Sequence, residues 1–285
     1  MDKDTFLNRK TTLNLKGQLL DLSTPSVMGI VNITPDSFFS DSRNATVDMA
    51  LQKTDKLLQE GAKFIDIGGY SSRPGAAEVS TAEETDRVVP VIEAISKAFP
   101  AAILSIDTFR ASVAEHSITA GAHLINDISG GELDQTMFDM VARLQVPYIL
   151  MHMKGTPQTM HKDPFYEDIT LEVASYFEKK IVALKALGVK DIILDPGFGF
   201  AKNATHNYKL LQEMSDLHIF GLPLLVGFSR KAMVYKTLGT TPEKALNGTT
   251  VLNTIALLKG ANIFRVHDVK EAAECVALVQ KMQQA

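Results

Sequence analysis

The stretch MGIVNITPDSFFSD, residues 28–41, begins as an apolar run and continues as a polar segment. Its carboxyl end carries one carboxamide, Asn32, and the turn-forming residues Thr34-Pro35-Asp36-Ser37 follow shortly after. A strand that is apolar along its whole length is typical of a parallel sheet buried on both faces. A polar side chain at the end of such a strand is typical of the mouth of a barrel, where ligands bind. We therefore expect Asn32 to meet a ligand there.

Similar apolar runs recur along the chain, with helix-like segments between them. The eight runs cover residues 27–33, 64–70, 102–108, 124–129, 148–153, 192–197, 224–229 and 263–268. Val47, Leu51, Thr54 and Leu58 in the first intervening segment have helical spacing. Eight such units in about 260 residues predict an α/β fold, a (β/α)8 TIM barrel. The alternative, an open doubly wound sheet, usually carries a G-x-G-x-x-G turn after its first strand, and this sequence has none.

Glycines and a short hairpin punctuate this pattern. Gly61, Gly121, Gly188 and Gly260 stand where helices should end before the next strand. Residues 11–23, TTLNLKGQLLDLS, predict a β-hairpin that turns at Lys16-Gly17 and closes the amino-terminal end of the barrel. We therefore divide the chain into a hairpin extension, residues 1–25, which is not an independent domain, and a (β/α)8 barrel, residues 26–285. No linker or low-complexity stretch suggests a further domain.

Bulk composition excludes several classes of protein. The 285 residues carry a net charge of −4, whereas nucleic-acid partners usually require a basic patch, so none is expected. The single cysteine, Cys275, excludes an internal disulfide, which fits a reducing compartment. It could be a nucleophile, but its place in a helical pattern favours a small packing residue. No run has the length of a signal peptide or a membrane span, which predicts a cytoplasmic protein without a membrane partner.

Polar side chains gather at the predicted strand ends. They are Asn32, Asp66, Asp107, Asn126, Asp127, His152, Asp195, Ser229, Arg265 and His267. A barrel brings all these ends to one face, where active sites of this fold lie. Proximity to water would explain a few of them, and Asp107 or Asp195 could be structural carboxylates bonded to backbone N–H groups. Amides, acids and cations from so many strands instead predict a site. The sequence lacks a G-x-S-x-G elbow, zinc-ligand spacing and a Walker loop.

These side chains suggest two subsites. Arg265 and His267, with Asn32 on the neighbouring strand, suit an anionic, metal-bound leaving group. The second set suits a flat heterocycle, because ring N–H groups need acceptors and the ring needs apolar faces. It consists of Asp107, Asn126, Asp195 and Lys231 around a cavity rimmed by Met153, Phe198 and Phe200.

At this point eight blocks of sequence, in order, resemble the dihydropteroate synthase family. They are MGIVNITPDSFFSD, IDIGGYSSRPG, SIDT, INDISGG, MHMKGTPQTM, DPGFGFAK, LVGFSRK and NGTTVLNTIALLKGANIFRVHDV. The resemblance implies a TIM-barrel transferase of folate biosynthesis. Such an enzyme condenses 6-hydroxymethyl-7,8-dihydropterin diphosphate with p-aminobenzoate and releases pyrophosphate with the help of Mg²⁺. The family is commonly homodimeric, through helices late in the barrel, and is the target of sulfonamides, which compete at the second-substrate site.

The resemblance also implies roles for particular residues. The pterin would contact Asp107, Asn126, Met153, Asp195, Phe200, Gly227, Lys231 and Arg265. The p-aminobenzoate and its loops would involve Thr34, Pro35, Asp36, Phe38, Ser71, Ser72, Arg73, Pro74, Phe200 and Ser229. The diphosphate would meet Asn32, Ser72, Arg73, Arg265 and His267, with Asn32 also placing the Mg²⁺. Catalysis would rest on Asn32, Asp107, Lys231, Arg265 and His267.

The second loop departs from the family pattern, GG-x-S-T-R-P-G, in which x is commonly acidic or an amide. Here x is Tyr70, and Ser72 replaces the threonine. Two other functions remain open. A methyltetrahydrofolate-type methyltransferase barrel would share the pterin pocket but would not need Asn32, Arg265, His267 or the Ser-Arg-Pro loop. A non-catalytic pterin-binding relative would have lost some of those residues.

Overall fold

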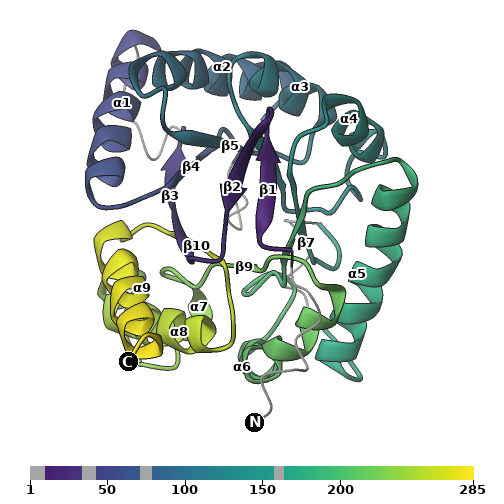
Figure 1. Cartoon of the computed structure of the whole chain (residues 1–285), viewed down its shortest axis with the longest axis vertical. Coiled ribbons are helices and arrows are strands. Elements are labelled where there is room, and N and C mark those ends of the chain that lie inside the picture. Colours follow the sequence, from purple (N-terminus) through teal and green to yellow (C-terminus); the bar gives the residue numbers. More distant parts are fainter. Residues whose placement is uncertain (1–9, 34–42, 71–78, 157–163) are drawn as a thin grey trace.

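A computed structural model of the chain describes residues 10–33, 43–70, 79–156 and 164–285. Eight parallel strands form its central sheet, in the spatial order β8-β7-β6-β5-β4-β3-β10-β9 (Figure 1). They are β3 (Ser26–Asn32), β4 (Phe64–Gly68), β5 (Ile103–Asp107), β6 (Leu124–Asp127), β7 (Tyr148–Met151), β8 (Ile192–Asp195), β9 (Leu225–Val226) and β10 (Ile263–Val266). A parallel bridge between Leu194 and Leu224 joins the two ends of this order, so the sheet closes into the predicted barrel.

Helices surround the barrel and pack on the outer face of its strands (Figure 1). They are α1 (Arg43–Gln59), α2 (Thr81–Ala98), α3 (Ala111–Thr119), α4 (Met137–Leu144), α5 (Ile169–Ala186), α6 (Ala204–Gln212), α7 (Ala232–Tyr235), α8 (Leu246–Leu258) and α9 (Val269–Gln283). Short 3-10 helices span Met214–Phe220 and Pro242–Lys244. All eight predicted strands and the alternation with helices are therefore confirmed.

Local chemistry explains where α5 begins and which face it buries. The Asp168 side chain accepts hydrogen bonds from the N–H groups of Thr170 and Leu171, which otherwise have no partner in the first turn. Val173, Phe177, Ile181 and Leu184 lie at helical spacing and are buried against the sheet. The four predicted helix-ending glycines have positive φ angles. At Gly121, with φ +124°, an added Cβ would lie 2.6 Å from the Ser96 Oγ, so the turn requires glycine.

The predicted hairpin closes the amino-terminal end of the barrel. Strands β1 (Thr12–Leu15) and β2 (Gln18–Asp21) pair antiparallel, and Lys16 and Gly17 have φ angles of 51° and 94°. Figure 1 shows this hairpin crossing the middle of the barrel. Leu13 and Leu22 are completely buried there, in a cluster with residues from inside the barrel such as Met28 and Ile193. The hairpin is therefore part of the hydrophobic core.

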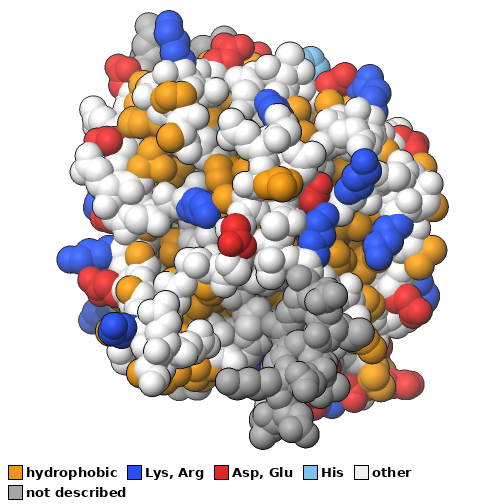
Figure 2. All heavy atoms as spheres, viewed as in Figure 1, with side chains coloured by type: hydrophobic (Ala, Val, Ile, Leu, Met, Phe, Trp, Pro, Cys, Tyr) orange, Lys and Arg blue, Asp and Glu red, His pale blue; other side chains and the backbone are white. Residues whose placement is uncertain are grey.

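Positive and negative side chains are mixed on the face of the molecule that carries the hairpin. Figure 2 shows Lys and Arg side chains interspersed there with Asp and Glu.

Within the described ranges no helix is both long enough and apolar enough to span a membrane. Cys275 is buried on α9, which confirms it as a packing residue.

Candidate active site

The strand register aligns three polar residues and one glycine at the carboxyl end of the barrel. Asn32 pairs with Gly68, Gly68 with Asp107, and Asp107 with Asn126, so these residues form one row across β3 to β6. Asp195 ends β8, where it pairs with Met151. The barrel thus brings Asn32, Asp107, Asn126 and Asp195 to one face, because the carboxyl ends of parallel strands meet there.

Arg265 is the centre of this face. Its Nε donates to the Asp66 Oδ2 and its Nη2 to the Asp107 Oδ2, both at 2.6 Å. The Asn126 Nδ2 donates to the same Asp66 oxygen at 3.1 Å. Burial by itself lowers the pKa of Arg265, but the charges of Asp66 and Asp107 outweigh it and raise the pKa. The guanidinium therefore stays charged and faces across the mouth of the barrel, where it can meet an anion.

Asp66 holds Arg265 in place, a role that the sequence did not reveal. The sequence placed this carboxylate at a strand end and gave it no partner. In the structure its side chain is completely buried and bonded to both Arg265 and Asn126. A completely buried carboxylate needs such a partner, because desolvation disfavours its charge. Because Asp66 follows two apolar residues of a buried strand, the sequence could have indicated a buried carboxylate that needs a cation. It could not have shown that this cation is Arg265.

The Asp107 carboxyl is more easily protonated in the folded protein than an aspartate carboxyl in water, because its pKa is raised. Burial raises the pKa of its carboxyl; the Arg265 guanidinium opposes the rise, and the neighbouring Asp66 adds to it. Its side chain keeps 20% of its surface exposed, so part of the carboxyl remains accessible to solvent. With its pKa raised to about 7, the Asp107 carboxyl can change its charge near neutral pH.

Asp195 and Lys231 form the opposite side of the site. The Asp195 Oδ1 accepts a hydrogen bond from the Gly197 N–H at 2.8 Å, so one oxygen of this carboxylate is already bonded to the backbone. The Lys231 Nζ donates to the Phe198 carbonyl and lies 4.7 Å from the centre of the Phe200 ring. Burial lowers the pKa of Lys231 to about 8, an effect that the Asp195 carboxylate opposes. Carboxylate and ammonium together offer both an acceptor and donors to a polar ring.

An apolar wall adjoins these polar groups. Met153 and the half-buried Phe200 pack in one cluster with Ile128, Met151, Ala201 and Phe109. Gly227 lies close to the polar groups, since a Cβ there would be 3.4 Å from the Arg265 carbonyl oxygen and 3.7 Å from the Lys231 Nζ. Met153, Phe200 and Gly227, which the sequence assigned to one pocket, thus lie in or beside the same group of residues.

The prediction for Phe198 is wrong. Its ring is completely buried and packs at 4.6 Å, centre to centre, against Phe228 in the core outside the barrel. Phe200 packs instead against the cluster of Met151 and Met153, so the two rings lie in different apolar clusters. Sequence spacing could not show this, because it depends on the left-handed backbone of Gly199, with φ +82°.

Ser229 and His267 meet, although the sequence assigned them to different subsites. The Ser229 Oγ accepts from the backbone N–H of His267 at 3.2 Å and lies 3.0 Å from the His267 Nδ1. Burial and the nearby Arg265 charge lower the pKa of His267 to about 4, so its imidazole is neutral near pH 7. The two predicted subsites are therefore joined at this point.

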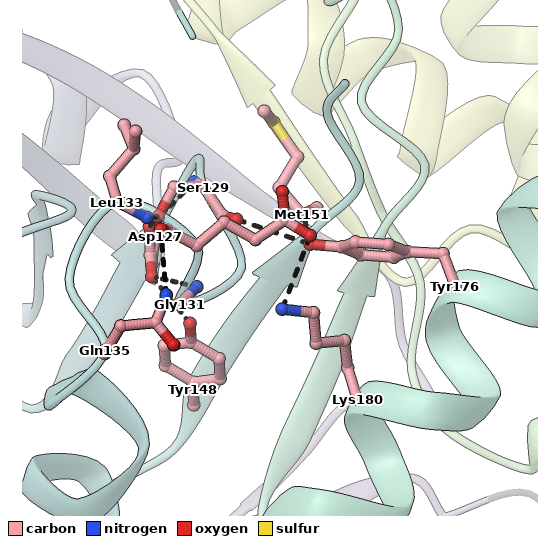
Figure 3. Close-up of polar contacts among 10 residues, drawn as sticks. Asp127, Ser129, Gly131, Leu133, Gln135, Tyr148, Met151, Tyr176 and Lys180 are labelled. Atoms are coloured by element: carbon pink, nitrogen blue, oxygen red, sulfur yellow. Dashed lines mark hydrogen bonds and ion pairs between the residues drawn. The ribbon is translucent and has the colours of Figure 1, made fainter. Parts of the chain in front are cut away.

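Figure 3 shows that the Asp127 side chain organises a backbone loop. Its Oδ1 accepts from the N–H and the hydroxyl of Ser129, both at 2.7 Å. Its Oδ2 accepts from the Gly131 N–H at 2.8 Å and from the Tyr148 hydroxyl at 2.7 Å. Neighbouring residues of a strand point to opposite faces, so Asn126 enters the barrel and Asp127 does not. Asp127 is a structural carboxylate.

His152 and Lys202 form a buried pair beside the pocket. The Lys202 Nζ lies 2.9 Å from the His152 Nδ1 and only 7% of the lysine is exposed. The sequence placed His152 at a strand end without a role and gave Lys202 none. A lysine that follows a strand and precedes a helix usually faces water, so no local signal marks it.

Most predicted loop residues lie outside the described residues. These are Thr34, Pro35, Asp36, Phe38, Ser71, Ser72, Arg73 and Pro74. Tyr70, the unusual residue of the second loop, is described: its ring packs edge-on against Phe109 at 5.1 Å, under the Arg110 guanidinium at 5.4 Å. Within the described part of the chain no three His, Cys, Asp or Glu side chains are grouped to hold a metal ion.

Comparison with known proteins agrees with this geometry. The family model described as pterin binding enzyme matches residues 28–267. A dihydropteroate synthase of Escherichia coli K12 is 44% identical over 267 residues, covering 93% of this chain and 94% of that protein. The Yersinia pestis dihydropteroate synthase, solved with a sulfonamide drug complex, superposes with a TM-score of 0.90 at 46% identity, covering 96% of this chain and 100% of the other.

A third relative was solved with a small aromatic acid. The Xanthomonas albilineans dihydropteroate synthase with 4-aminobenzoic acid superposes with a TM-score of 0.89 at 38% identity, covering 96% of this chain and 99% of the other. Sequence coverage, identity and fold therefore agree with the chemistry of the site. The chain belongs to the family of pterin-binding enzymes that includes the dihydropteroate synthases.

Proposed function

We propose that the protein is a dihydropteroate synthase, a transferase of folate biosynthesis. It condenses 6-hydroxymethyl-7,8-dihydropterin diphosphate with p-aminobenzoate and releases pyrophosphate. The observation that carries this proposal is Arg265, whose guanidinium is bonded to Asp66 and Asp107 at the mouth of the barrel. In the proposed complex this fixed cation would contact both the flat ring and its anionic leaving group. The family membership and the synthase relatives support the same activity.

The pterin ring would bind between the polar row and the apolar wall. Its N–H groups need acceptors, which Asp195 and the Asn126 side chain supply at the ends of β8 and β6. Lys231 can donate to ring acceptors, and Met153 and Phe200 offer apolar faces. These groups bind and orient the ring, which brings its CH₂–O bond toward Arg265.

The reaction then needs little proton chemistry from the protein. The CH₂–O bond breaks with its electron pair on the departing diphosphate, and the amine nitrogen of p-aminobenzoate forms the new C–N bond and loses a proton. Arg265 stabilises the departing diphosphate, and Asp107 offsets positive charge that develops on the ring. The neutral His267 can offer an N–H to the same anion, while Ser229 lies beside it for the second substrate.

The residues present fit a Mg²⁺ ion that arrives with the diphosphate. Such ions are typically held by one or two protein oxygens together with substrate phosphates and water. Asn32 supplies a hard carboxamide oxygen from the end of β3, half-buried in the same row as Asp107. We propose Asn32 as the protein ligand; when bound, the ion would neutralise charge on the leaving group.

Two alternatives fit the site less well. A methyltetrahydrofolate-type methyltransferase or a non-catalytic pterin-binding relative would not need Arg265 and His267 beside the pocket. Both side chains are present and lie at the same mouth, with Arg265 contributing to the low pKa of His267. The synthase is therefore the better supported activity.

We also infer a homodimer, formed through the last two long helices. Four apolar side chains there are strongly exposed: Val251 and Leu258 on α8 are 49% and 56% exposed, and Leu278 and Met282 on α9 are 73% and 59% exposed. Exposed apolar groups on adjoining helices are typical of subunit contacts. Sedimentation analysis would give twice the chain mass, and a monomer at micromolar concentration would contradict the inference.

The single buried cysteine supports a place in the reducing cytoplasm.

The direct test is turnover. Incubation with the dihydropterin diphosphate, p-aminobenzoate and Mg²⁺ should release pyrophosphate and form dihydropteroate. Arg265→Ala should lower kcat/KM by about 10²-fold or more, because a cation aimed at the leaving group is lost. Arg143→Ala, which removes an exposed arginine paired with Glu115, serves as the control and should leave turnover unchanged. No turnover by the unaltered chain, or near-normal turnover by Arg265→Ala, would reject the assignment.

A further inference from the structure

We propose that Lys202 is a positioning residue for the pterin pocket. Its buried side chain, together with His152, fixes the loop that follows β8 and so places Phe200 and Asp195 for the ring. The inference rests on the proposed function and adds to it two residues that would not themselves touch the substrate. It explains why a lysine and a histidine are buried together beside an active site.

The contacts of Lys202 all lead to the two strand ends that bound the pocket. Its Nζ lies 2.9 Å from the His152 Nδ1, just beyond β7. It also donates to the carbonyls of Gly197 at 3.0 Å and Phe200 at 3.1 Å, in the loop after β8. The His152 carbonyl is within 3.4 Å. One amine therefore joins the ends of two neighbouring strands.

The loop lies so close to His152 that its backbone has little freedom. Gly197 has φ +69°, and a Cβ at this position would be 2.0 Å from the His152 carbonyl oxygen and 3.3 Å from the Lys202 Nζ. Glycine is required for both reasons. The carbonyls of Gly197 and Phe200 are turned toward a buried lysine, and without it they would face a buried space without a donor.

A second lysine holds the same loop from its other side. Lys231 donates to the Phe198 carbonyl and lies over the Phe200 ring. Carbonyls 197 and 200 therefore point to Lys202, and carbonyl 198 points to Lys231. Phe200 is fixed through its carbonyl by one lysine and faces the other with its ring. Its place in the pocket wall thus depends on both side chains.

His152 is suited to accept rather than donate. Burial and the neighbouring Lys202 lower the pKa of its imidazole, so the ring is neutral and its Nδ1 can accept from the lysine. The ring packs edge-on against Tyr176 at 4.9 Å, and the Tyr166 hydroxyl donates to the Ala201 carbonyl at 2.9 Å. His152 and the end of the loop are therefore held by α5 and by the segment before it.

Lys202 acts through the loop and not on the substrate. The lysine is 7% exposed and its amine is surrounded by the protein acceptors named above, which leaves no position for a ligand atom. Burial lowers the pKa of its amine to about 7, while Asp195 opposes this shift. A residue that shapes the ground-state pocket should affect the KM for the pterin substrate more than kcat.

The test is calorimetric binding of 6-hydroxymethylpterin, which lacks the diphosphate, to the full-length protein. Lys202→Met keeps an unbranched side chain but loses the donor, and it should weaken binding by about tenfold or more. In turnover, the KM for the dihydropterin diphosphate should rise by a similar factor while kcat changes by less than about threefold. Lys10→Met is the matched control, since Lys10 also donates to a carbonyl and lies beside a carboxylate, at the opposite end of the barrel.

Variants of His152 test the proposal independently of how well Lys202→Met folds. His152→Asn retains an acceptor near the position of Nδ1 and should bind the pterin within about threefold of the unaltered chain. His152→Leu removes the acceptor and should weaken binding by about tenfold. Folded Lys202→Met or His152→Leu with unchanged pterin affinity and KM would overturn the inference. Failure of the unaltered chain to bind pterin would instead reject the proposed function.

Discussion

Asp195 shows how one carboxylate can serve both backbone and ligand. Its Oδ1 accepts from the Gly197 N–H, which shapes the turn after β8. Burial raises the pKa of its carboxyl, and the nearby Lys231 is the largest influence that opposes this rise. In the proposed complex it accepts from pterin N–H groups.

Asp195→Asn should therefore weaken pterin binding by about 2–4 kcal/mol. An asparagine can keep its oxygen toward Gly197, but its NH₂ group would then face the ring N–H groups. Isothermal calorimetry measures the difference. Asp191→Asn, four residues earlier and paired with Lys10 beyond the other end of β8, is the control and should change affinity by less than about twofold. Equal affinity for Asp195→Asn and the unaltered chain would remove this residue from the pterin site.

His267 should make stability depend on pH. Its pKa is lowered to about 4 in the folded protein, whereas an unfolded histidine titrates near about 6.5. Between these values the unfolded chain binds more protons. His267 therefore contributes less stability as pH falls through this window, and the loss is complete below about pH 4.

Urea unfolding at about pH 7.5 and about pH 5 tests this behaviour. His267→Gln should lose less stability between the two pH values than the unaltered chain, because it cannot take up the proton. His116→Gln, at an exposed position on α3, should keep the original dependence. Identical pH dependence in His267→Gln and the unaltered chain would show that His267 is not buried neutral.

At the scale of an element, strand β6 ends in two polar residues with different roles: one faces the candidate site and the other stabilises a loop. Asn126 faces into the barrel and donates a hydrogen bond to Asp66. Asp127 fixes the loop of residues 128–131 and accepts from the hydroxyl of Tyr148 on β7 (Figure 3). Tyr176 on α5 adds bonds to the carbonyls of Ser129 and Met151, both at 3.3 Å. The loop therefore links β6, β7 and α5.

Asp127→Asn should lower the free energy of unfolding by about 2–4 kcal/mol, because an amide NH₂ would face buried donors. Denaturant unfolding measures this loss. Asp139→Asn, at an exposed position on α4, should stay within about 0.5 kcal/mol of the unaltered chain. A similarly small effect of Asp127→Asn would mean that the four hydrogen bonds of Asp127 contribute little to the free energy of unfolding.

At the scale of the whole molecule, stability and function lie at opposite ends of the barrel. The hairpin buries Leu13 and Leu22 against the amino-terminal end, while the polar row lies at the carboxyl ends of the strands. Substitution in the hairpin core should therefore affect folding without reaching the pterin pocket.

Leu13→Ala should cost about 2–4 kcal/mol of unfolding free energy, from lost burial and the cavity left behind. Leu19→Ala, in the same hairpin but at a side chain 77% exposed, should cost less than about 0.5 kcal/mol. Pterin affinity should be unchanged in both, as calorimetry on the folded fraction would show. A large loss of affinity in Leu13→Ala would contradict the separation of the two ends.

The sequence by itself determined the elements and the family. Apolar runs, helical spacing and helix-ending glycines are local signals, so they located all eight strands and the turn at Lys16-Gly17. The count of eight units and the absence of a G-x-G-x-x-G turn favoured closure into a barrel, which the bridge between Leu194 and Leu224 confirms. The meeting of the strand ends on one face follows from closure, which is why the candidate site could be assembled from residues far apart in the chain.

The tertiary structure alone decided how these side chains face and pair. It separated Asn126 from Asp127 and Phe200 from Phe198, and it joined Ser229 to His267. It also gave Arg265 a partner 199 residues away, Asp66, and buried Lys202 against His152. The physical reason is that the direction of a side chain depends on backbone turns and strand register. Its partners depend on which strands adjoin after closure, and no local pattern records either.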